Sequence, residues 1–184
     1  MDIQELMGQI LGKDSVKNLS KVTKTSQKDV KNVLTSALPS LVSGLQTQAN
    51  GDTAESFATA LNDHAKVDTS SIKSFMSGVD IADGGKIVAH LLGGSKETAT
   101  KEAAEKAGVA PTKAGNILSA AAPLLLSLVG QQSGGNNTAS GVSGMIGSLI
   151  GNADLGSIVS GLASGSSGNS GGLLGGLLGL FKKK

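Results

Sequence analysis

The chain has 184 residues, enough for one domain with its own hydrophobic core and a further segment. It contains no Cys, which excludes a disulfide scaffold and thiolate metal sites, and no Trp or Tyr, so its core depends on Leu, Ile, Val and Ala. The net charge of only +2 and the absence of Arg argue against nucleic-acid binding, because Arg supplies bidentate contacts to phosphates and guanine edges.

The N-terminal segment does not resemble an export signal. Residues 1–5 (MDIQE) are acidic, whereas a signal peptide begins with basic residues and continues with an apolar stretch. No segment reaches the roughly 20 consecutive apolar residues that a membrane-spanning helix needs. We therefore expect a cytoplasmic protein without a Sec signal peptide.

A short apolar helix is the first predicted element, and its pattern returns later in the chain. Residues 6–12 (LMGQILG) correspond to residues 87–93 (IVAHLLG). Each segment closes with a glycine, Gly12 and Gly93, which we expect to be a left-handed C-cap because glycine adopts positive φ without strain. The recurrence predicts an internal duplication.

A charged, Lys-rich helix follows in each copy, over about residues 15–24 and 95–106, and a long amphipathic helix comes next. The apolar residues of the two long helices have the same offsets and keep the i, i+3, i+4, i+7 spacing of a buried helix face. These residues are Val30, Val33, Leu34, Ala37, Leu38, Leu41, Val42 and Leu45 in the first copy and Ala114, Ile117, Leu118, Ala121, Ala122, Leu125, Leu126 and Val129 in the second.

Proline occurs at the same place in both long helices, as Pro39 and Pro123. A proline inside a helix removes one hydrogen bond and crowds the carbonyl four residues earlier, which belongs to Thr35 in one helix and to Ser119 in the other. Two interpretations are open. Either the prolines kink or break the long helices, or each proline starts a new helix at its first position.

Two further helices are predicted between the copies. Residues 52–55 (DTAE) match a capping box that would open the first, and Asp68 or Thr69 would open a shorter one that stops at Gly78. Residues 83–85 (DGG) then mark the start of the second copy. The core faces of these connecting helices are predicted to contain Phe57, Leu61, Ile72, Phe75 and Met76.

These elements predict a compact all-α bundle over residues 1–130. The bundle would consist of two copies, at about 3–49 and 84–130, joined by two helices within 53–77. Residues 131–184 would form a Gly/Ser/Leu-rich extension that is partly helical, because Gly, Ser and Asn become frequent there.

The predicted extension is almost uncharged. Between Lys113 and Lys182 the only charged residue is Asp154. Within it, residues 145–151 (MIGSLIG) repeat the pattern of the short apolar helix a third time. The extension could therefore be a degenerate further copy that lacks its charged helix.

These features resemble the YidB-like bacterial family, a domain of unknown function. The resemblance rests on residues 84–93 (GGKIVAHLLG), on the long helix with residues 122–125 (APLL) and on the Gly/Leu-rich C-terminus, and it spans about residues 2–130. It implies an all-helical domain. It implies no catalytic residue, cofactor or substrate.

His64 and His90 are the only histidines, so a general base or a histidine metal ligand would have to be one of them. His90 is the better candidate, yet no carboxylate lies at a helical ligand spacing from it, such as His-x-x-x-Glu, and Gln9 stands in the first copy where His90 stands in the second. We expect His90 to be a hydrogen-bonded structural histidine and predict no catalytic residue, metal site or cofactor.

Residues 84–86 (GGK) resemble part of a phosphate-binding loop. The full loop motif would need a glycine at position 80 and a hydroxyl residue at 87, where the chain has Asp80 and Ile87. We therefore interpret these glycines as helix punctuation.

The C-terminal segment offers the most specific candidate contact surface. Its leucines and Phe181 could lie in a membrane interface with the lysines on anionic headgroups, while its glycines four residues apart could equally support self-association, and a disordered tail is a third interpretation. The contact residues would be Leu173, Leu174, Leu177, Leu178, Leu180, Phe181, Lys182, Lys183 and Lys184.

The sequence thus favours a non-enzymatic structural or self-assembly protein that acts through helix–helix packing, as a homo-oligomer. The alternative is a peripheral membrane protein anchored by the C-terminal Leu/Gly/Lys segment. A carrier that holds an apolar ligand between the kinked helices ranks lower. No nucleic-acid partner and no small-molecule substrate is predicted.

Overall fold

The computed structural model describes residues 3–132 and 137–151, and within these ranges the secondary structure is helical without any strand. The predicted all-α class is confirmed. The helices are α1 (Ile3–Ile10), α2 (Lys13–Thr23), α3 (Gln27–Asn50), α4 (Ala54–Ala65), α5 (Ile72–Ser77), α6 (Ile81–Leu92), the 3-10 turn η1 (Gly93–Ser95), α7 (Lys96–Ala107), α8 (Pro111–Gln132) and α9 (Ala139–Gly151).

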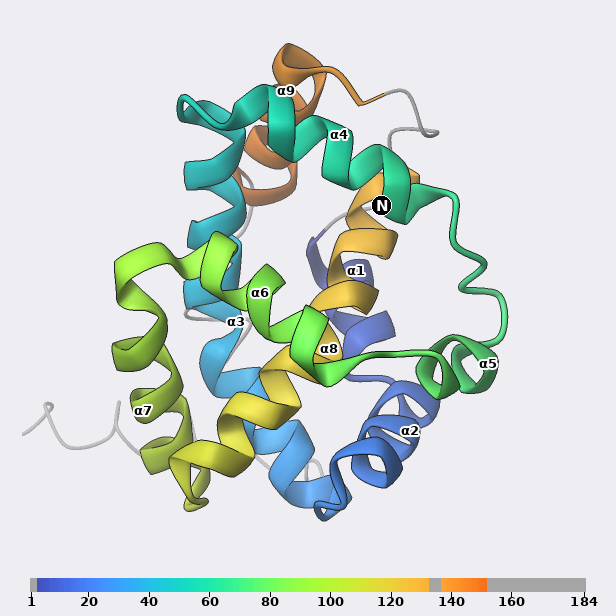
Figure 1. Ribbon diagram of the computed structural model, residues 1–184, viewed down its shortest axis with the longest axis vertical. Helices are drawn as coiled ribbons and strands as arrows, with labels where there is room; N and C mark the ends of the chain where they lie inside the picture. The colour runs from blue at the N-terminus through green and yellow to red at the C-terminus, as the bar shows by residue number, and fades with distance from the viewer. Residues whose placement is uncertain (1–2, 133–136, 152–184) are drawn as a thin grey trace, which may run out of the picture.

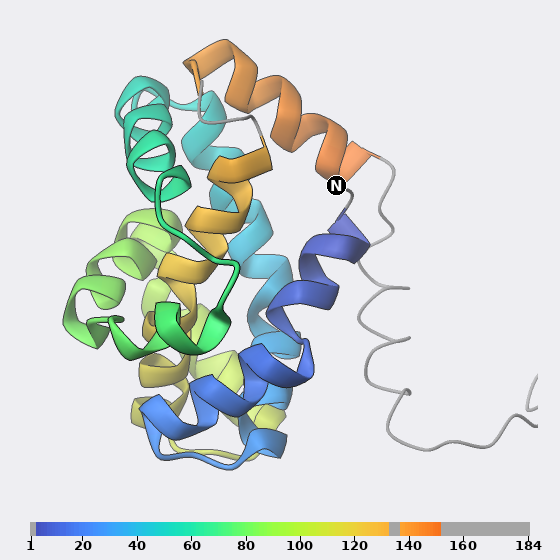
Figure 2. The same cartoon turned by 90° about the vertical axis from the view of Figure 1, so that its right-hand side faces the viewer.

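The two long helices, α3 and α8, form the centre of the bundle (Figures 1 and 2). Helices α6 and α7 cover one side of this pair, α1 and α2 the other, and α4 and α9 pack at one end. All sixteen apolar positions predicted on the long helices are buried. Their periodicity therefore identified the core faces correctly.

The order short helix, charged helix, long proline-containing helix occurs twice, as α1–α2–α3 and α6–α7–α8. The two triads do not pack alike. Helix α6 packs mainly on α8 of its own triad, whereas α1 contacts α8 of the other triad, and α7 lies against both long helices. The triads consequently share one core, and neither buries its apolar faces alone.

Both prolines lie inside continuous helices, Pro39 in α3 and Pro123 in α8. The interpretation that each proline starts a new helix, or breaks the long helix into two, is wrong. Apolar residues on both sides of each proline are buried in the same core, so tertiary packing holds the helix together across the missing hydrogen bond.

The glycines that close the short helices do not form the expected left-handed caps. Gly12 has a φ of −59° and precedes α2 as its N-cap, and Gly93 combines a φ of 51° with a ψ of −132°. The left-handed caps of the described residues are instead Lys24, which follows α2, and Gly108, which follows α7.

The predicted starts of three helices also differ from those in the structure. Helix α4 begins after Thr53, one residue later than a capping box over residues 52–55 requires, and the Thr53 side chain accepts no capping hydrogen bond. The Thr53 hydroxyl donates to the side-chain oxygen of Gln48 at 2.7 Å. Ser71 caps α5 in place of Asp68 or Thr69. Asp80 caps α6 through its carboxylate, so residues 83–85 lie within the helix and do not precede it.

Helix α8 is long and apolar enough to span a membrane, and it is the one such helix in the described residues. In the bundle, however, 78% of its most apolar window is buried against other helices. Its composition is therefore accounted for by its central place in the core.

Candidate functional site

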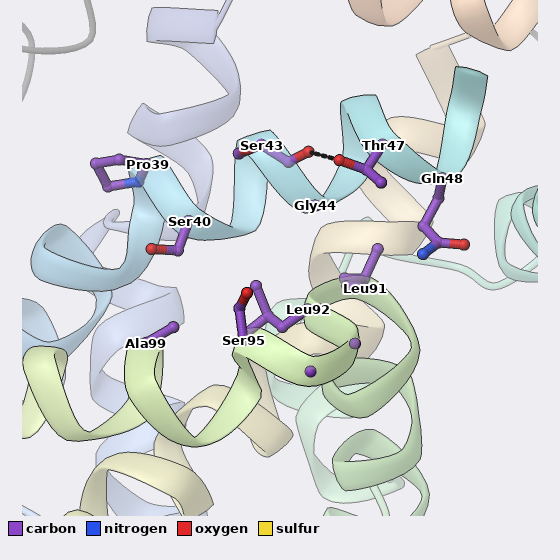
Figure 3. Close-up of a pocket in the computed structure, with 12 residues that line it drawn as sticks. Pro39, Ser40, Ser43, Gly44, Thr47, Gln48, Leu91, Leu92, Ser95 and Ala99 are labelled. Carbon is purple, nitrogen blue, oxygen red and sulfur yellow. Dashed lines mark hydrogen bonds between the residues drawn. The ribbon is translucent and has the colours of Figure 1, made fainter. Parts of the chain in front are cut away.

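A groove of about 590 Å³ runs along the C-terminal half of α3, opposite the end of α6, η1 and the start of α7 (Figure 3). Its walls are hydroxyl and amide side chains of α3 and the backbone of Gly93 and Gly94, over a floor of Leu91 and Leu92. No charged residue lines it. The lining residues are Pro39, Ser40, Ser43, Gly44, Thr47, Gln48, Leu91, Leu92, Gly93, Gly94, Ser95 and Ala99.

Helices α3 and α6 come into direct backbone contact within the groove. A Cβ on Gly44 of α3 would lie 2.5 Å from the carbonyl oxygen of Leu91, so only glycine permits this approach of α3 and α6. Beside this crossing, the Gln48 amide donates to the carbonyl of His90 at 2.8 Å. The groove is thus an uncharged depression whose α3 wall runs from Pro39 to Gln48 (Figure 3).

The two histidines meet in a second, smaller pocket of about 220 Å³. His64 comes from α4 and His90 from α6, and the remaining lining is mostly apolar. Sequence reasoning treated the two histidines separately and gave no sign that they share a pocket. The lining residues are Phe57, Ala60, His64, Lys86, Ile87, His90, Leu91 and Leu126.

Burial lowers the pKa of His64 from its ordinary value of 6.5, and the nearby carboxylates of Asp83 and Asp63 only partly oppose this effect. Burial therefore favours the neutral form of His64. Within residues 3–132 and 137–151 no group of three or more acidic or histidine side chains is placed to hold a metal ion.

A third cavity, of about 610 Å³, is lined by lysines from three helices. Lys13 belongs to α2, Lys28 and Lys31 to the start of α3, and Lys106 to the end of α7. The sequence does not suggest this cluster, because these lysines are scattered among acidic residues along the chain.

Helix α9 lies on the outside of α3 and α4 and contains the third short apolar pattern, residues 145–151. Val142 and Ile146 bury one face in the common core. The opposite face is exposed and carries only Gly and Ser side chains at Ser140, Gly141, Gly144, Gly147 and Ser148.

The entry to α9 is anchored on α4 by a pair of asparagines. The backbone N–H of Asn137 donates to the side-chain oxygen of Asn62 at 2.7 Å, and the Asn62 amide donates to the Asn137 carbonyl at 2.9 Å. The Asn137 amide also donates to Asn62, at 3.0 Å, and Asn137 is only 6% exposed. These three hydrogen bonds fix the start of α9 against the bundle.

The predicted contact residues at the C-terminus, Leu173 to Lys184, lie outside the described residues. Residues 84–86 are part of α6, and Lys86 pairs with Asp83 at 3.3 Å on the surface.

Comparison with known families identifies the family of this chain. The model of the family described as "Bacterial protein of unknown function (DUF937)" matches residues 5–132. The chain belongs to this family. The YidB-like resemblance is confirmed, because YidB is a DUF937 protein.

The DUF937 match ends where α8 ends, at Gln132, so α9 and the following residues lie beyond it. Helices α1 to α8 are the DUF937 part of the structure. No curated protein and no solved structure matches the chain.

Proposed function

We propose that this DUF937 protein is a non-enzymatic structural protein that self-associates through the region following its DUF937 part. The observation that carries the proposal is the outer face of α9, which is exposed and bears neither charge nor any large side chain. None of the 13 residues of α9 is charged.

Helices on the surface of a soluble monomer ordinarily carry charged residues on the face that meets water. The outer face of α9 departs from this rule. A Cβ added at Gly144 or Gly147 would have no neighbouring atom within 4 Å, so the backbone itself is open to a partner. Small residues four or three apart allow two helices to approach closely and gain dispersion contacts along their backbones.

The groove along α3 supports the same role. It is uncharged like the face of α9, and both features are built on the C-terminal half of α3, since Ser143 of α9 donates to Asn50 at the end of that helix. An uncharged segment rich in Gly and Leu, such as residues 172–181 of a second copy, has the composition to pack on such a surface.

The test is the mass of the full-length protein in solution, by multi-angle light scattering across a concentration series. Gly144→Gln and Gly147→Gln together would place two long side chains on the outer face of α9 without a clash in the monomer. We expect the wild type to form oligomers and this variant to shift towards monomer.

Gly8→Gln is the matched control, because Gly8 is also an exposed helical glycine with nothing within 4 Å of an added Cβ, and it lies on α1. It should oligomerise like the wild type. A wild type that stays monomeric at every concentration would overturn the proposal.

Two full-length variants test the C-terminal segment, which would be the membrane anchor in the alternative proposal. Leu177→Ser with Leu178→Ser should weaken self-association if that segment takes part, whereas Lys182, Lys183 and Lys184 changed to Ala should leave it intact. If the wild type is monomeric but co-sediments with anionic vesicles, and the lysine variant does not, the membrane alternative replaces self-association.

A further inference from the structure

The cavity lined by lysines, which we call the lysine cleft, is built from elements far apart in the chain. Leu11 precedes α2, Lys13 and Val16 belong to α2, and Lys106 lies near the end of α7. The rest of the lining comes from the first three turns of α3, at Gln27, Lys28, Lys31, Asn32, Thr35 and Ser36. Its volume of about 610 Å³ lies within the range of small-molecule sites, roughly 300–1,000 Å³.

Four lysines line this cleft, and no carboxylate lines it with them. Asp14 and Asp29 follow Lys13 and Lys28 in the chain, yet no acidic residue lines the cleft. None of the four lysines forms an ion pair within the described part of the chain, whose ion pairs are Lys66–Asp63 and Lys86–Asp83. The overall charge of the protein is only +2, so this local concentration of positive charge comes from the tertiary structure.

The wall of the cleft holds the Thr35 hydroxyl, which has no hydrogen-bond partner among the described residues. Thr35 is only 8% exposed and lines the cleft, and its side chain makes no hydrogen bond within the described residues. Other threonines inside helices of this bundle, such as Thr23, donate to the carbonyl four residues earlier, at 2.7 Å in that case. Among the described residues only Ser127 has a fully buried side-chain oxygen without a partner, so the Thr35 hydroxyl is accessible from the cleft and can donate to a ligand there.

Three neutral donors stand beside Thr35. The side chains of Gln27, Asn32 and Ser36 line the cleft and likewise make no hydrogen bond within the described residues. The cleft also contains the first turn of α3, a 24-residue helix whose N-terminal N–H groups and dipole favour negative charge. Every polar side chain that lines the cleft can donate a hydrogen bond.

From this arrangement we infer that the lysine cleft binds a small anion that carries several phosphate groups. Lys acts as a point charge for phosphate oxygens, and the hydroxyl and amide donors complete their hydrogen bonds. The cleft has no aromatic side chain on which a base could stack, and Leu11 and Val16 are its only aliphatic residues. The recognised group is therefore the phosphate cluster itself.

The test is isothermal titration of the full-length protein with inorganic tripolyphosphate, with orthophosphate and citrate for comparison. We expect tripolyphosphate to bind more tightly than both, and its affinity to fall as salt is added. Lys28→Gln with Lys31→Gln should reduce the affinity at least tenfold, because the variant removes two of the four positive charges that would pair with phosphate oxygens.

Lys17→Gln with Lys21→Gln is the control of equal charge. Both residues are exposed on α2 and lie outside the cleft, so this variant should stay within about twofold of the wild-type affinity. Equal losses in the two double variants would mean that general surface charge attracts the anion, and would overturn the proposal.

Thr35→Val distinguishes a built site from a patch of surface lysines, since it changes no charge and almost no volume. We expect it to reduce tripolyphosphate affinity several-fold while thermal unfolding, followed by circular dichroism, shows an intact fold. Unchanged affinity in this variant would overturn the proposal.

The phosphate groups that bind in the cleft could belong to a soluble anion or to lipid headgroups. A second experiment, vesicle sedimentation, distinguishes these two sources. Vesicles of phosphatidylglycerol are sedimented with the wild type and with the two lysine variants. Tripolyphosphate binding without vesicle binding assigns the cleft to soluble anions, and vesicle binding that depends on Lys28 and Lys31 assigns it to headgroups. Binding of neither probe would overturn the inference.

Discussion

Gly84 in α6 lies so close to the carbonyl oxygen of Ser119 in α8 that a Cβ at position 84 would overlap this oxygen, well inside 3.0 Å. The carbonyl of Ser119 is the one that Pro123 leaves without its helical N–H donor. The proline ring borders the same place, 3.4 Å from the position of that Cβ. Helix α6 thus packs, backbone to backbone, over the interruption that Pro123 makes in the hydrogen bonding of α8.

Gly84→Ala should destabilise the protein by about 2–3 kcal/mol, because the added methyl group forces α6 away from α8. Gly85→Ala is the matched control. Its Cβ would meet only the Ser119 hydroxyl, at 3.4 Å, and alanine stabilises a helix interior by roughly 0.5–1 kcal/mol relative to glycine. Urea denaturation of both variants measures the difference, and equal stabilities would contradict the close approach.

Ser127 is fully buried in α8, and its hydroxyl has no hydrogen-bond partner among the residues that the structure describes. Ser127→Ala should therefore raise the free energy of unfolding by about 1 kcal/mol or more, since it removes a buried polar group that lacks a partner. Ser15→Ala should act in the opposite sense, because the equally buried Ser15 donates to the carbonyl of Gln9 at 2.6 Å. Urea denaturation tests both signs, and destabilisation by Ser127→Ala would show that its hydroxyl is bonded.

Asn62→Ala should loosen α9 by removing its asparagine anchor. The backbone and amide donors of Asn137 would both lose the side-chain oxygen of Asn62, and we expect a loss of about 2–3 kcal/mol. Hydrogen exchange should show faster exchange in α9 than in α3. Asn18→Ala is the control, since its exposed side chain only donates to the Asp14 carbonyl of its own helix. Unchanged protection of α9 in Asn62→Ala would refute this role.

His64 should make stability depend on pH below about its ordinary pKa of 6.5. Because burial lowers its pKa in the folded state, the unfolded chain binds the proton more readily, so the free energy of unfolding falls as pH decreases below 6.5 and levels off below the folded pKa. His64→Gln cannot titrate and should lose less stability between pH 7.5 and pH 5.5 than the wild type. Urea denaturation midpoints at the two pH values test this prediction. Equal losses of stability in the wild type and in His64→Gln would exclude a contribution from His64.

The helices and their buried faces could be predicted because both depend on local spacing. Val30, Leu34 and Leu41 recur at helical intervals, and the side chains at such intervals share one face of the helix whatever lies opposite. The helix ends were harder to predict. Residues 52–55 have the right residue types for a capping box that begins at Asp52, yet α4 begins one residue later, after Thr53. The Thr53 hydroxyl donates to Gln48 of the preceding helix, a partner that only the turn between α3 and α4 brings near.

The candidate sites were not predictable in the same way. His64 and His90 share a pocket because α4 and α6 both pack on α8, and Lys28 and Lys106 meet because α7 lies along α3. These neighbours are separated by 26 to 78 residues in the chain, and no local pattern connects them. The side-chain types were visible beforehand, but their proximity was not.

The sequence alone therefore determined the all-helical class, the apolar register of the long helices and the presence of an uncharged region after residue 130, since composition and periodicity act over a few turns. The tertiary structure decided that both long helices continue through Pro39 and Pro123, where glycine permits helices to touch and which lysines face a common cleft. Those features depend on how the helices cross, and the crossings are set by side chains distant in sequence that fill one shared core.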